Sequence, residues 1–459
     1  MLLKLNRKRT LYAWLGVCLA SLAISTQAKE LPEGTVISAA NLDEIYEDTF
    51  EGHKISDLLT ERFEMWVRDY GLTMELEHSS ELAYDPKWEE ATRQNAGKAS
   101  LGPDKTVQGH VAGAPFPNWD VDTDDPDCGW KLAWNFYLAN PNLTDDWIAT
   151  GEVFILDKDR GIIDNFLAHS GNMKWEGRIR GEPRLDGQPN EHARYLLVLT
   201  EPYDIAGIGV FTRQYNDATA DDGYVYVRSL RRVRRTAGGK SWIDPQPKMD
   251  LLNDDNQGVL GYPGFYEDWQ CKGKRHVLQV VDAPDGNYTK KGEITEWVNT
   301  SESPHWNLIG TKWQPREVFV VEGTPPDYHP YGKKVLYMDA KYPFYYHGEF
   351  YDKKGDFWRL WHTRFYPYWR GNCDGAPGMG NFNTLAIDFQ AERATYIHQY
   401  LNQHNCLDPR FMESTILQKA ASGAMQAELD QMSAAYRQRP LLPQHKERAE
   451  AWLKARGEL

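Results

Sequence analysis

The apolar positions of the chain follow two different periods, which separate a long strand-rich part from two helical parts. Between about residues 96 and 375, short aromatic and β-branched runs alternate with turn residues, as in DWIATGEVFILDKDRG, RYLLVLTEP and KVLYMDAKYPFYYHGEF. The segments DKDRG, APDGN and DKKGD are typical of hairpin turns. No regular alternation of strands with helices accompanies these runs. The pattern therefore predicts an antiparallel sheet rather than a parallel α/β fold.

The parts on either side of this region have helical spacing. In SDLLTERFEMWVRDYG, Ser56 is a suitable N-cap, Gly71 a suitable C-terminal glycine, and one apolar face holds Leu59, Phe63, Trp66 or Val67, and Tyr70. We expect this helix to pack on the main domain. Near the C-terminus, a second helical face holds Ile416, Ala420, Met425, Leu429 and Met432. The predicted fold is mainly β with flanking helices (α+β): a helical and irregular region over 29–95, a sheet domain over 96–375 and a helical extension over 376–459.

The strands are aromatic on both faces, most clearly in YPFYYHGEFY and DFWRLWHTRFYPYW. A sheet of this kind must bury both faces. One face can meet helices, while the other meets either an ordinary core or an apolar cavity with a few polar groups. By strand context, the candidate ligand-binding residues of such a cavity are Tyr224, Tyr226, Phe319, Phe344, Tyr346 and Trp358.

The stretch VYVRSLRRVRRTAGGKSW places five arginines within eight positions of an acidic chain. Its apolar face changes sides after Val227, which predicts a strand with a bulge or a change of environment near Ser229 and Leu230. The arginines pair either with carboxylates on neighbouring strands or with a ligand headgroup or partner protein. For the second role the candidates are Arg231, Arg232 and Arg234.

The first 28 residues have the order of a secretory signal peptide: a basic start, a short apolar run, and Thr26 and Ala28 before a cleavage site. We expect cleavage after Ala28 and a periplasmic protein; lipidation at Cys18 is the alternative. Removal of this basic segment takes the formal charge from −14 to −18. Such a charge argues against a nucleic-acid partner.

Four cysteines remain after the leader, and an exported chain with an even number favours disulfides. Four cysteines allow three pairings. We favour Cys373–Cys406, because both lie in loop-like segments, and this choice leaves Cys128–Cys271. None of the four belongs to a CxxC pair, so their spacing does not indicate a metal site.

The usual sequence motifs of catalysis are missing. The chain has no HExxH, GxSxG or GxxxxGK[ST] motif and no GxGxxG after a strand. We therefore assign no catalytic residue, metal or cofactor and expect a protein that is not an enzyme. A carbohydrate-active enzyme stays as an alternative, because 17 tryptophans suit sugar stacking and a glycosidase needs two facing carboxylates. The acid pairs Asp124/Asp125, Asp221/Asp222 and Asp254/Asp255 are interpreted as solvated loop residues.

Motifs in a fixed order over about 330 residues resemble the DUF1329 proteins of Gram-negative bacteria. They include GTVISAANLDEI, DPDCGWKLAWNFY, VYVRSLRRVRRT, GYPGFYEDWQCKGKRHVL and IDFQAERATYI. The resemblance implies a fold like that of the lipoprotein carriers LolA and LolB, in which a strongly curved antiparallel sheet, an unclosed β-barrel, wraps helices and leaves a hydrophobic cavity. The chain departs from the family pattern at Cys128 and Cys271, which leaves open a disulfide particular to this branch.

The function that the resemblance implies is a periplasmic carrier or accessory protein that binds a lipid or other hydrophobic molecule. It also implies work beside an RND-type transporter and an outer-membrane β-barrel protein. The alternatives are a docking subunit of an envelope export complex without a small-molecule ligand, and the carbohydrate-active enzyme. The observation that separates these hypotheses is whether the concave face of the sheet is apolar and hollow.

Overall fold

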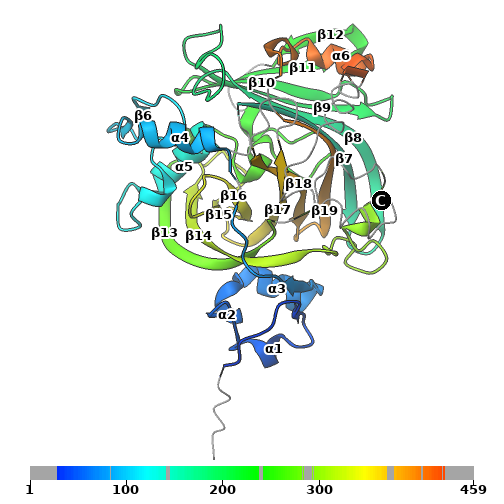
Figure 1. Cartoon of the computed structure of the whole chain (residues 1–459). Coiled ribbons are helices and arrows are strands. Elements are labelled where there is room, and N and C mark those ends of the chain that lie inside the picture. Colours follow the sequence, from blue (N-terminus) through cyan, green and yellow to red (C-terminus); the bar gives the residue numbers. More distant parts are fainter. Residues whose placement is uncertain are drawn as a thin grey trace, which may run out of the picture.

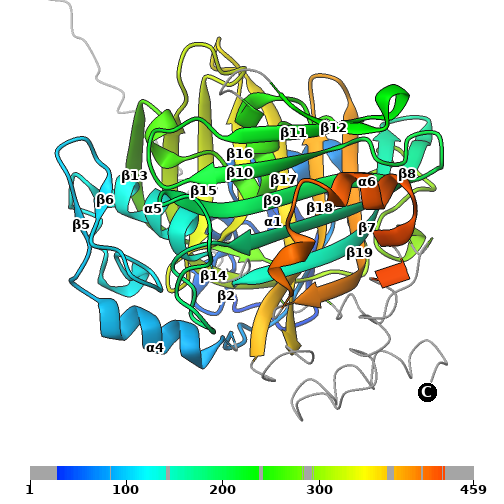
Figure 2. The same cartoon turned by 90° about the horizontal axis from the view of Figure 1, so that it is seen from above.

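A computed structural model describes residues 28–82, 84–140, 145–236, 241–281, 283, 292, 294–369, 377–404, 407–425 and 427–428. Fifteen of the described strands form one large curved sheet (Figures 1 and 2). In spatial order the main path is β1 (Val36–Ile37), β4 (Met74–Leu76), β14 (Lys312–Thr324), β15 (Lys333–Asp339), β16 (Tyr345–Tyr351), β17 (Phe357–Trp369), β18 (Pro377–Asp388), β19 (Arg393–His404), β7 (Asp146–Asp157), β8 (Gly161–Lys174), β9 (Glu191–Glu201), β10 (Gly209–Tyr215), β11 (Asp222–Val227) and β12 (Arg232–Arg235), and β13 (Asp268–Gln279) pairs with β14.

The sheet is antiparallel except where β4 runs parallel to β14. It curls strongly but does not close into a barrel, because the path ends at β12 on one side and at β1 on the other. The expected mainly β fold with a large, curved antiparallel sheet is confirmed. Two expected turns are also in place, since the hairpins β7–β8 and β16–β17 turn at DKDRG and DKKGD.

Both faces of the sheet are buried, as the aromatic pattern predicts. In β7, Val153 and Ile155 belong to a core cluster on the inner, concave face, whereas Phe154 and Leu156 belong to a cluster on the outer face. The strands alternate in this way because successive side chains point to opposite faces. The inner face and three separate outer clusters together form the core.

Short elements of the N-terminal and C-terminal parts cover the outer face. Helices α1 (Leu42–Ile45), α2 (Ile55–Leu58) and α3 (Glu61–Tyr70) form one cover, α4 (Pro86–Asn95) a second and α6 (Ile416–Ala421) a third. Two small hairpins accompany them, β2 (Thr49–Phe50) with β3 (His53–Lys54), and β5 (Ser100–Leu101) with β6 (Val107–Gln108). Figure 1 shows α1–α3 outside the curve of the sheet and α6 next to β12.

Helix α3, which the sequence predicts to pack on the main domain, begins later than expected. Its N-cap is Thr60, whose hydroxyl accepts a hydrogen bond from the backbone N of Phe63 at 3.1 Å, and not Ser56. The chain is extended at Leu59, so residues 55–58 form the separate turn α2. Gly71 ends α3 in the left-handed conformation, as expected.

The C-terminal boundary of the sheet was wrong in the prediction. Strands β18 and β19 extend it to His404, well past residue 375. In the expected C-terminal helix, α6 buries Ile416 and Ala420, and Met425 is buried just after it, whereas Leu429 and Met432 lie outside the described residues.

Helix α5 (Cys128–Ala139) packs on the inner side against β13 and β14 and is buried along almost its whole length. A disulfide between Cys128 and Cys271 ties its first turn to β13. The approach is close: a Cβ on Gly129 would lie 2.4 Å from the carbonyl oxygen of Trp269. Cys373 and Cys406, the pairing that we favour from sequence, lie outside the described residues.

Candidate functional site

The inner face of the sheet is covered by a segment that contains no helix beyond short 3-10 turns and no strand. This inner segment, residues 241–267, contains η3 (Ser241–Ile243), η4 (Asn253–Gly258) and η5 (Pro263–Phe265). Its apolar side chains join the same cluster as α5 and the inner side chains of the strands. The buried ones are Trp242, Met249, Leu251, Leu252, Val259, Tyr262 and Tyr266.

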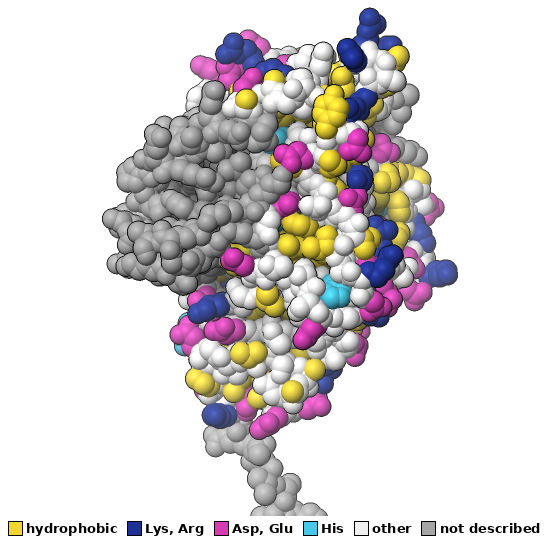
Figure 3. All heavy atoms as spheres, turned by 90° about the vertical axis from the view of Figure 1, so that its right-hand side faces the viewer, with side chains coloured by type: hydrophobic (Ala, Val, Ile, Leu, Met, Phe, Trp, Pro, Cys, Tyr) yellow, Lys and Arg dark blue, Asp and Glu magenta, His cyan; other side chains and the backbone are white. Residues whose placement is uncertain are grey.

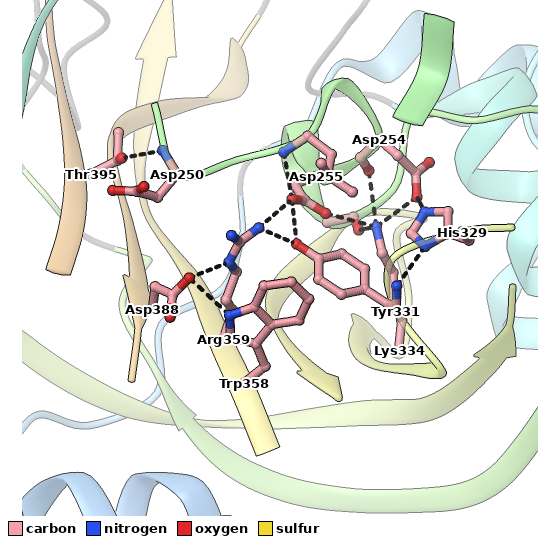
Figure 4. Close-up of polar contacts among 12 residues, drawn as sticks. Asp250, Asp254, Asp255, His329, Tyr331, Lys334, Trp358, Arg359, Asp388 and Thr395 are labelled. Atoms are coloured by element: carbon pink, nitrogen blue, oxygen red, sulfur yellow. Dashed lines mark hydrogen bonds and ion pairs between the residues drawn. The ribbon is translucent and has the colours of Figure 1, made fainter. Parts of the chain in front are cut away.

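A fully buried ion-pair cluster anchors the middle of the inner segment to strand β15 (Figure 4). The ammonium of Lys334 lies 2.7 Å from Oδ2 of Asp254 and 3.0 Å from Oδ1 of Asp255, and none of the three side chains is exposed. The same ammonium donates hydrogen bonds to the carbonyl oxygens of Asp254 and Gly258, both at 3.1 Å. Two carboxylates therefore share one buried cation, which fixes η4 on the sheet.

Neighbouring polar groups complete this cluster. Tyr331 donates its hydroxyl to Oδ2 of Asp255 at 2.7 Å and accepts a hydrogen bond from Arg359 at 2.8 Å, and Arg359 also donates to Asp388 at 2.9 Å. Burial alone raises the pKa of Asp254, but the charge of Lys334 and a hydrogen bond from His329 outweigh it and lower this pKa to about 2. Asp254 is thus ionised over the whole physiological range.

A small hairpin of the inner segment lies between this anchor and the solvent. We call residues 245–252 the cover hairpin; it is closed by a β-bridge between Pro245 and Leu252 and by a hydrogen bond from the backbone N of Gln246 to the carbonyl oxygen of Leu251. Its tip is held by two partly exposed ion pairs. Lys248 pairs with Asp164 of β8 at 2.7 Å, and Asp250 pairs with Arg393 of β19 at 3.1 Å.

These tip contacts are partly exposed, so water screens them and they contribute little stability. The backbone N of Asp250 adds one hydrogen bond, to the hydroxyl of Thr395 at 3.2 Å. The cover hairpin is therefore held by weak polar contacts at its tip, by the packing of Met249, Leu251 and Leu252 in the inner core cluster, and by the buried anchor just beyond its end.

A cavity of about 40 Å³ lies beneath the cover hairpin. Its lining mixes apolar and polar side chains and comes from β7, β8, β9, β17, β18 and β19 on one side and from Gln246, Met249, Leu251 and residues 255–257 on the other. This volume holds a few water molecules and no lipid chain. The sequence left open whether the concave face lines a cavity or is a filled core, and in the structure the inner segment fills it.

A larger cleft of about 390 Å³ opens to solvent beside α5. Trp134 and Leu138 line it from the helix, and Glu176 and Arg184 form an ion pair at 2.8 Å in its wall. The mixed polar lining makes this cleft a poorer place for an apolar chain than the inner face.

The six predicted aromatic residues do not lie together. Phe319 and Trp358 belong to or pack against the inner cluster, whereas Phe344 and Tyr346 pack in an outer cluster with Trp88 of α4. Tyr224 and Tyr226 pack against a third cluster, which includes residues of α6. Only Phe319 and Trp358 are on the inner side, and neither lines the cavity under the cover hairpin. Strand context identifies buried aromatics but does not identify the face.

The predicted arginine strand is a hairpin. Residues 228–230 form the 3-10 turn η2, and Arg231 adopts a left-handed conformation, with φ of 50°, before the chain returns as β12. The expected break near Ser229 and Leu230 is in place, but it reverses the chain rather than kinking one strand. Arg231, Arg232 and Arg234 are exposed. Among the described residues, Arg228 donates a hydrogen bond to the carbonyl oxygen of Tyr203, and Arg235 pairs with Asp222.

The sequence interpretation missed the buried anchor. We interpreted Asp254 and Asp255 as solvated loop residues, and this is wrong because both are fully buried. A signal exists in the adjacent pair Lys333 and Lys334: on a strand buried on both faces, two successive lysines cannot both point to solvent. Lys333 is exposed beside Glu322, and Lys334 points inward.

The other two acid pairs also serve structural contacts, since Asp125 pairs with Lys131 and Asp222 with Arg235. The described residues contain no group of three or more His, Cys, Asp or Glu side chains that could hold a metal ion. In the part of the chain that the structure describes, no helix is long and apolar enough to span a bilayer.

These features define a class: an unclosed antiparallel sheet whose concave, apolar face is filled by one helix and one irregular segment. Residues 36–421 match the family model described as "Protein of unknown function (DUF1329)", so the chain belongs to the DUF1329 family and the resemblance seen in the sequence is confirmed. No curated protein matches the chain.

Several solved structures are similar in fold. A DUF1329 family protein from Desulfovibrio piger has 16% identity and a TM-score of 0.43, and the match covers 64% of this chain and 100% of that one. A putative outer membrane lipoprotein-sorting protein domain from Vibrio parahaemolyticus has 16% identity and a TM-score of 0.39, with 61% and 93% covered. A LolA superfamily protein from Nitrosomonas europaea has 12% identity and a TM-score of 0.33, with 59% and 90% covered.

Proposed function

We propose that this protein is a periplasmic carrier or accessory protein that holds a lipid or other apolar molecule against the inner face of the sheet. The observation that carries the proposal is the cover hairpin: an irregular, weakly tethered element occupies an apolar concave face. Its Met249 and Leu251 bury apolar surface that a ligand chain would bury in their place.

Binding in this way exchanges one apolar contact for another. A ligand gains about 25 cal/mol for each Å² of apolar surface that it removes from water, and it must offset the exposure of the hairpin's own side chains. The ion pairs of Lys248 and Asp250 are already partly solvated, so their loss costs about 0–1 kcal/mol each. The buried anchor at Asp254 and Asp255 stays in place and acts as the pivot.

A reversible cross-link tests this movement. The backbone N of Asp250 and the hydroxyl of Thr395 are 3.2 Å apart, so the two residues are neighbours and we choose this pair for cysteine substitution (Asp250→Cys with Thr395→Cys). A thiol titration after oxidation shows whether the disulfide that would lock the cover hairpin shut has formed. The probe is a fluorescent fatty acid added to the purified mature chain. We expect saturable uptake by the wild type and by the reduced variant, and at least tenfold weaker uptake by the oxidised variant.

The wild-type protein treated with the same reductant is the matched control, because Cys128–Cys271 is present in both. Uptake by the oxidised variant equal to that of the reduced form would show that the cover hairpin does not need to move. Absence of uptake by the wild type, together with no co-purifying lipid in native mass spectrometry, would contradict the carrier function itself.

The remaining predictions from sequence concern location and partners. The signal peptide lies in residues outside the described part of the chain, so export and cleavage after Ala28 stay predictions, as do an RND-type transporter and an outer-membrane β-barrel protein as partners. The carbohydrate-active enzyme, which the tryptophan content suggested, gains no support from the acid pairs, since Asp125, Asp222, Asp254 and Asp255 each pair with a cation of the same chain.

A further inference from the structure

Two hairpin tips lie side by side near the free edge of the sheet, next to α6 (Figure 2). One is the loop 202–208 between β9 and β10, and the other is the turn 228–231 between β11 and β12. Arg228 joins them: its Nη1 donates to the carbonyl oxygens of Tyr203 at 2.6 Å and Ala206 at 3.1 Å. The two tips are thus held in a fixed relation.

Large apolar side chains point to solvent at both tips. Tyr203 is 80% exposed, Leu230 53% and Ile208 37%, and these are three of the eight large apolar residues that are exposed in the described part of the chain. Exposed apolar residues that are scattered singly need no explanation, but a gathering of them marks an interaction site.

Unpaired positive charge lies at the second tip and along β12, the strand that follows it. Arg231, Arg232 and Arg234 are exposed and make no hydrogen bond or ion pair with another described residue in the structure, while Arg228 keeps its charge beside Tyr203. Two carboxylates, Glu201 and Asp204, lie in the loop 202–208 or just before it. Figure 3 shows basic side chains beside apolar ones at the top of the molecule.

We propose that this tip patch, made of Tyr203, Ile208, Leu230, Arg231, Arg232 and Arg234, binds the surface of an anionic phospholipid bilayer. Tyrosine and leucine side chains enter the boundary between headgroups and acyl chains. Guanidinium groups form paired hydrogen bonds with lipid phosphates, while their aliphatic stems stay on the apolar side.

An acidic protein segment fits these observations less well. A strand added to the edge of β12 would use backbone groups along the strand, whereas the exposed apolar residues lie at the tips. Charges on a short edge strand usually prevent such pairing. The net charge of −14 does not forbid the bilayer, because exposed charges more than about 8 Å away are largely screened at physiological salt.

Vesicle co-sedimentation of the mature chain tests the proposal, and it needs no cavity ligand. The vesicles are phosphatidylcholine alone, or phosphatidylcholine with one-third phosphatidylglycerol. We expect binding to the anionic vesicles only, and weaker binding at high salt.

Three arginines near the surface are together worth on the order of a hundredfold in partitioning, so the combined Arg231→Glu, Arg232→Glu, Arg234→Glu variant should lose at least that factor. Tyr203→Ser with Leu230→Ser should also weaken binding, while leaving the salt dependence in place.

A matched control has the same change in charge elsewhere: Lys98→Glu, Lys353→Glu, Lys354→Glu, all at exposed positions. This control should bind as the wild type does, apart from a small general effect. The proposal is overturned if the wild type ignores anionic vesicles at physiological salt, or if the control loses as much binding as the arginine variant. Melting temperatures within a degree or two of the wild type would show that the tip variants are folded. If they unfold, single Arg→Gln variants measured in the same assay decide.

Fatty-acid uptake that persists while vesicle binding fails would contradict this proposal and leave the carrier function standing.

Discussion

At the scale of single residues, the inner face depends on charges that water does not reach. Lys334 forms ion pairs with two aspartates of the inner segment, and the three side chains are completely buried. A buried ion pair adds little net stability compared with a well-packed apolar core, but loss of one partner leaves a charge without compensation. The cluster therefore specifies where the inner segment sits more than how stable the protein is.

Removal of the cation tests this role. In Lys334→Met, Asp254 and Asp255 lose their common partner, and we expect a loss of about 3–5 kcal/mol in the free energy of unfolding. Lys333→Met is the matched control. Lys333 precedes Lys334 on the same strand and makes a partly exposed ion pair with Glu322 at 3.6 Å, which is worth about 0–1 kcal/mol. Urea denaturation of both variants at neutral pH measures the difference. Equal effects of the two substitutions would show that Lys334 does not anchor the segment.

A second buried group makes stability depend on pH. His362 of β17 packs between Phe63 of α3 and Trp313 of β14, and neither of its ring nitrogens has a hydrogen-bond partner among the described residues. Burial, with a contribution from Arg364, lowers its pKa to about 3. The unfolded chain takes up a proton near pH 6.5, so the folded state should lose up to about 1.4 kcal/mol per pH unit as pH falls below 6.5 toward 3.

The substitution His362→Phe isolates this effect. It should raise the free energy of unfolding by about 1 kcal/mol at pH 7, because two unsatisfied polar atoms leave the core. The gain should grow as pH falls, since the carboxylates titrate equally in both proteins. Urea denaturation from pH 7.5 to pH 4.5 measures the gap, and a gap that stays constant over this range would contradict a neutral buried His362.

At the scale of elements, the sequence predicted the position of a strand or turn correctly where the spacing of apolar residues and the turn residues agree. It failed where contacts with other parts of the fold decide between two possible positions. The turn DKDRG places the β7–β8 hairpin because Gly161, with φ of 80°, supplies the conformation that the turn requires. The helix start was wrong because Ser56 and Thr60 are both acceptable caps, and only the packing of Leu59 selects the second.

The arginine stretch and the inner segment show the same limit. After Val227 the apolar residues change from one face of the strand to the other, which fits both a bulge and a reversal of the chain. The reversal depends on the left-handed conformation of Arg231, and nothing in the sequence indicates that conformation. The cover hairpin has a turn-like sequence, PQPKMD, but nothing in it shows that the turn folds into the sheet rather than out to solvent. Asp254 and Asp255 were interpreted as solvated loop residues, and the structure shows that they are buried.

At the scale of the whole molecule, the two faces of the sheet differ in how they are covered. The outer face carries helices whose buried residues, such as Trp66 of α3 and Leu417 of α6, are fully enclosed. The inner face carries α5, which a disulfide holds on β13, and the inner segment, whose cover hairpin is tethered at the tip by partly exposed contacts. Within the inner covering, we therefore expect the cover hairpin to open before α5, because partly solvated ion pairs hold its tip whereas a disulfide holds the helix.

Hydrogen exchange with mass spectrometry tests this division on the intact mature chain. Segments with solvent-exposed tethers open at lower free energy than fully enclosed ones. Because the tip of the cover hairpin is held by partly exposed ion pairs, peptides that cover residues 245–252 should exchange faster than peptides from α5 or β9 in the absence of ligand, even though Met249 and Leu251 are buried. With a saturating fatty acid, exchange in the cover hairpin should rise further, because the ligand takes its place, while exchange in β7, β8 and β19 should fall. The buried anchor predicts that peptides around Asp254 and Asp255 change least. Uniform protection of the inner segment by the ligand would show instead that the apolar molecule binds on top of a cover that stays closed.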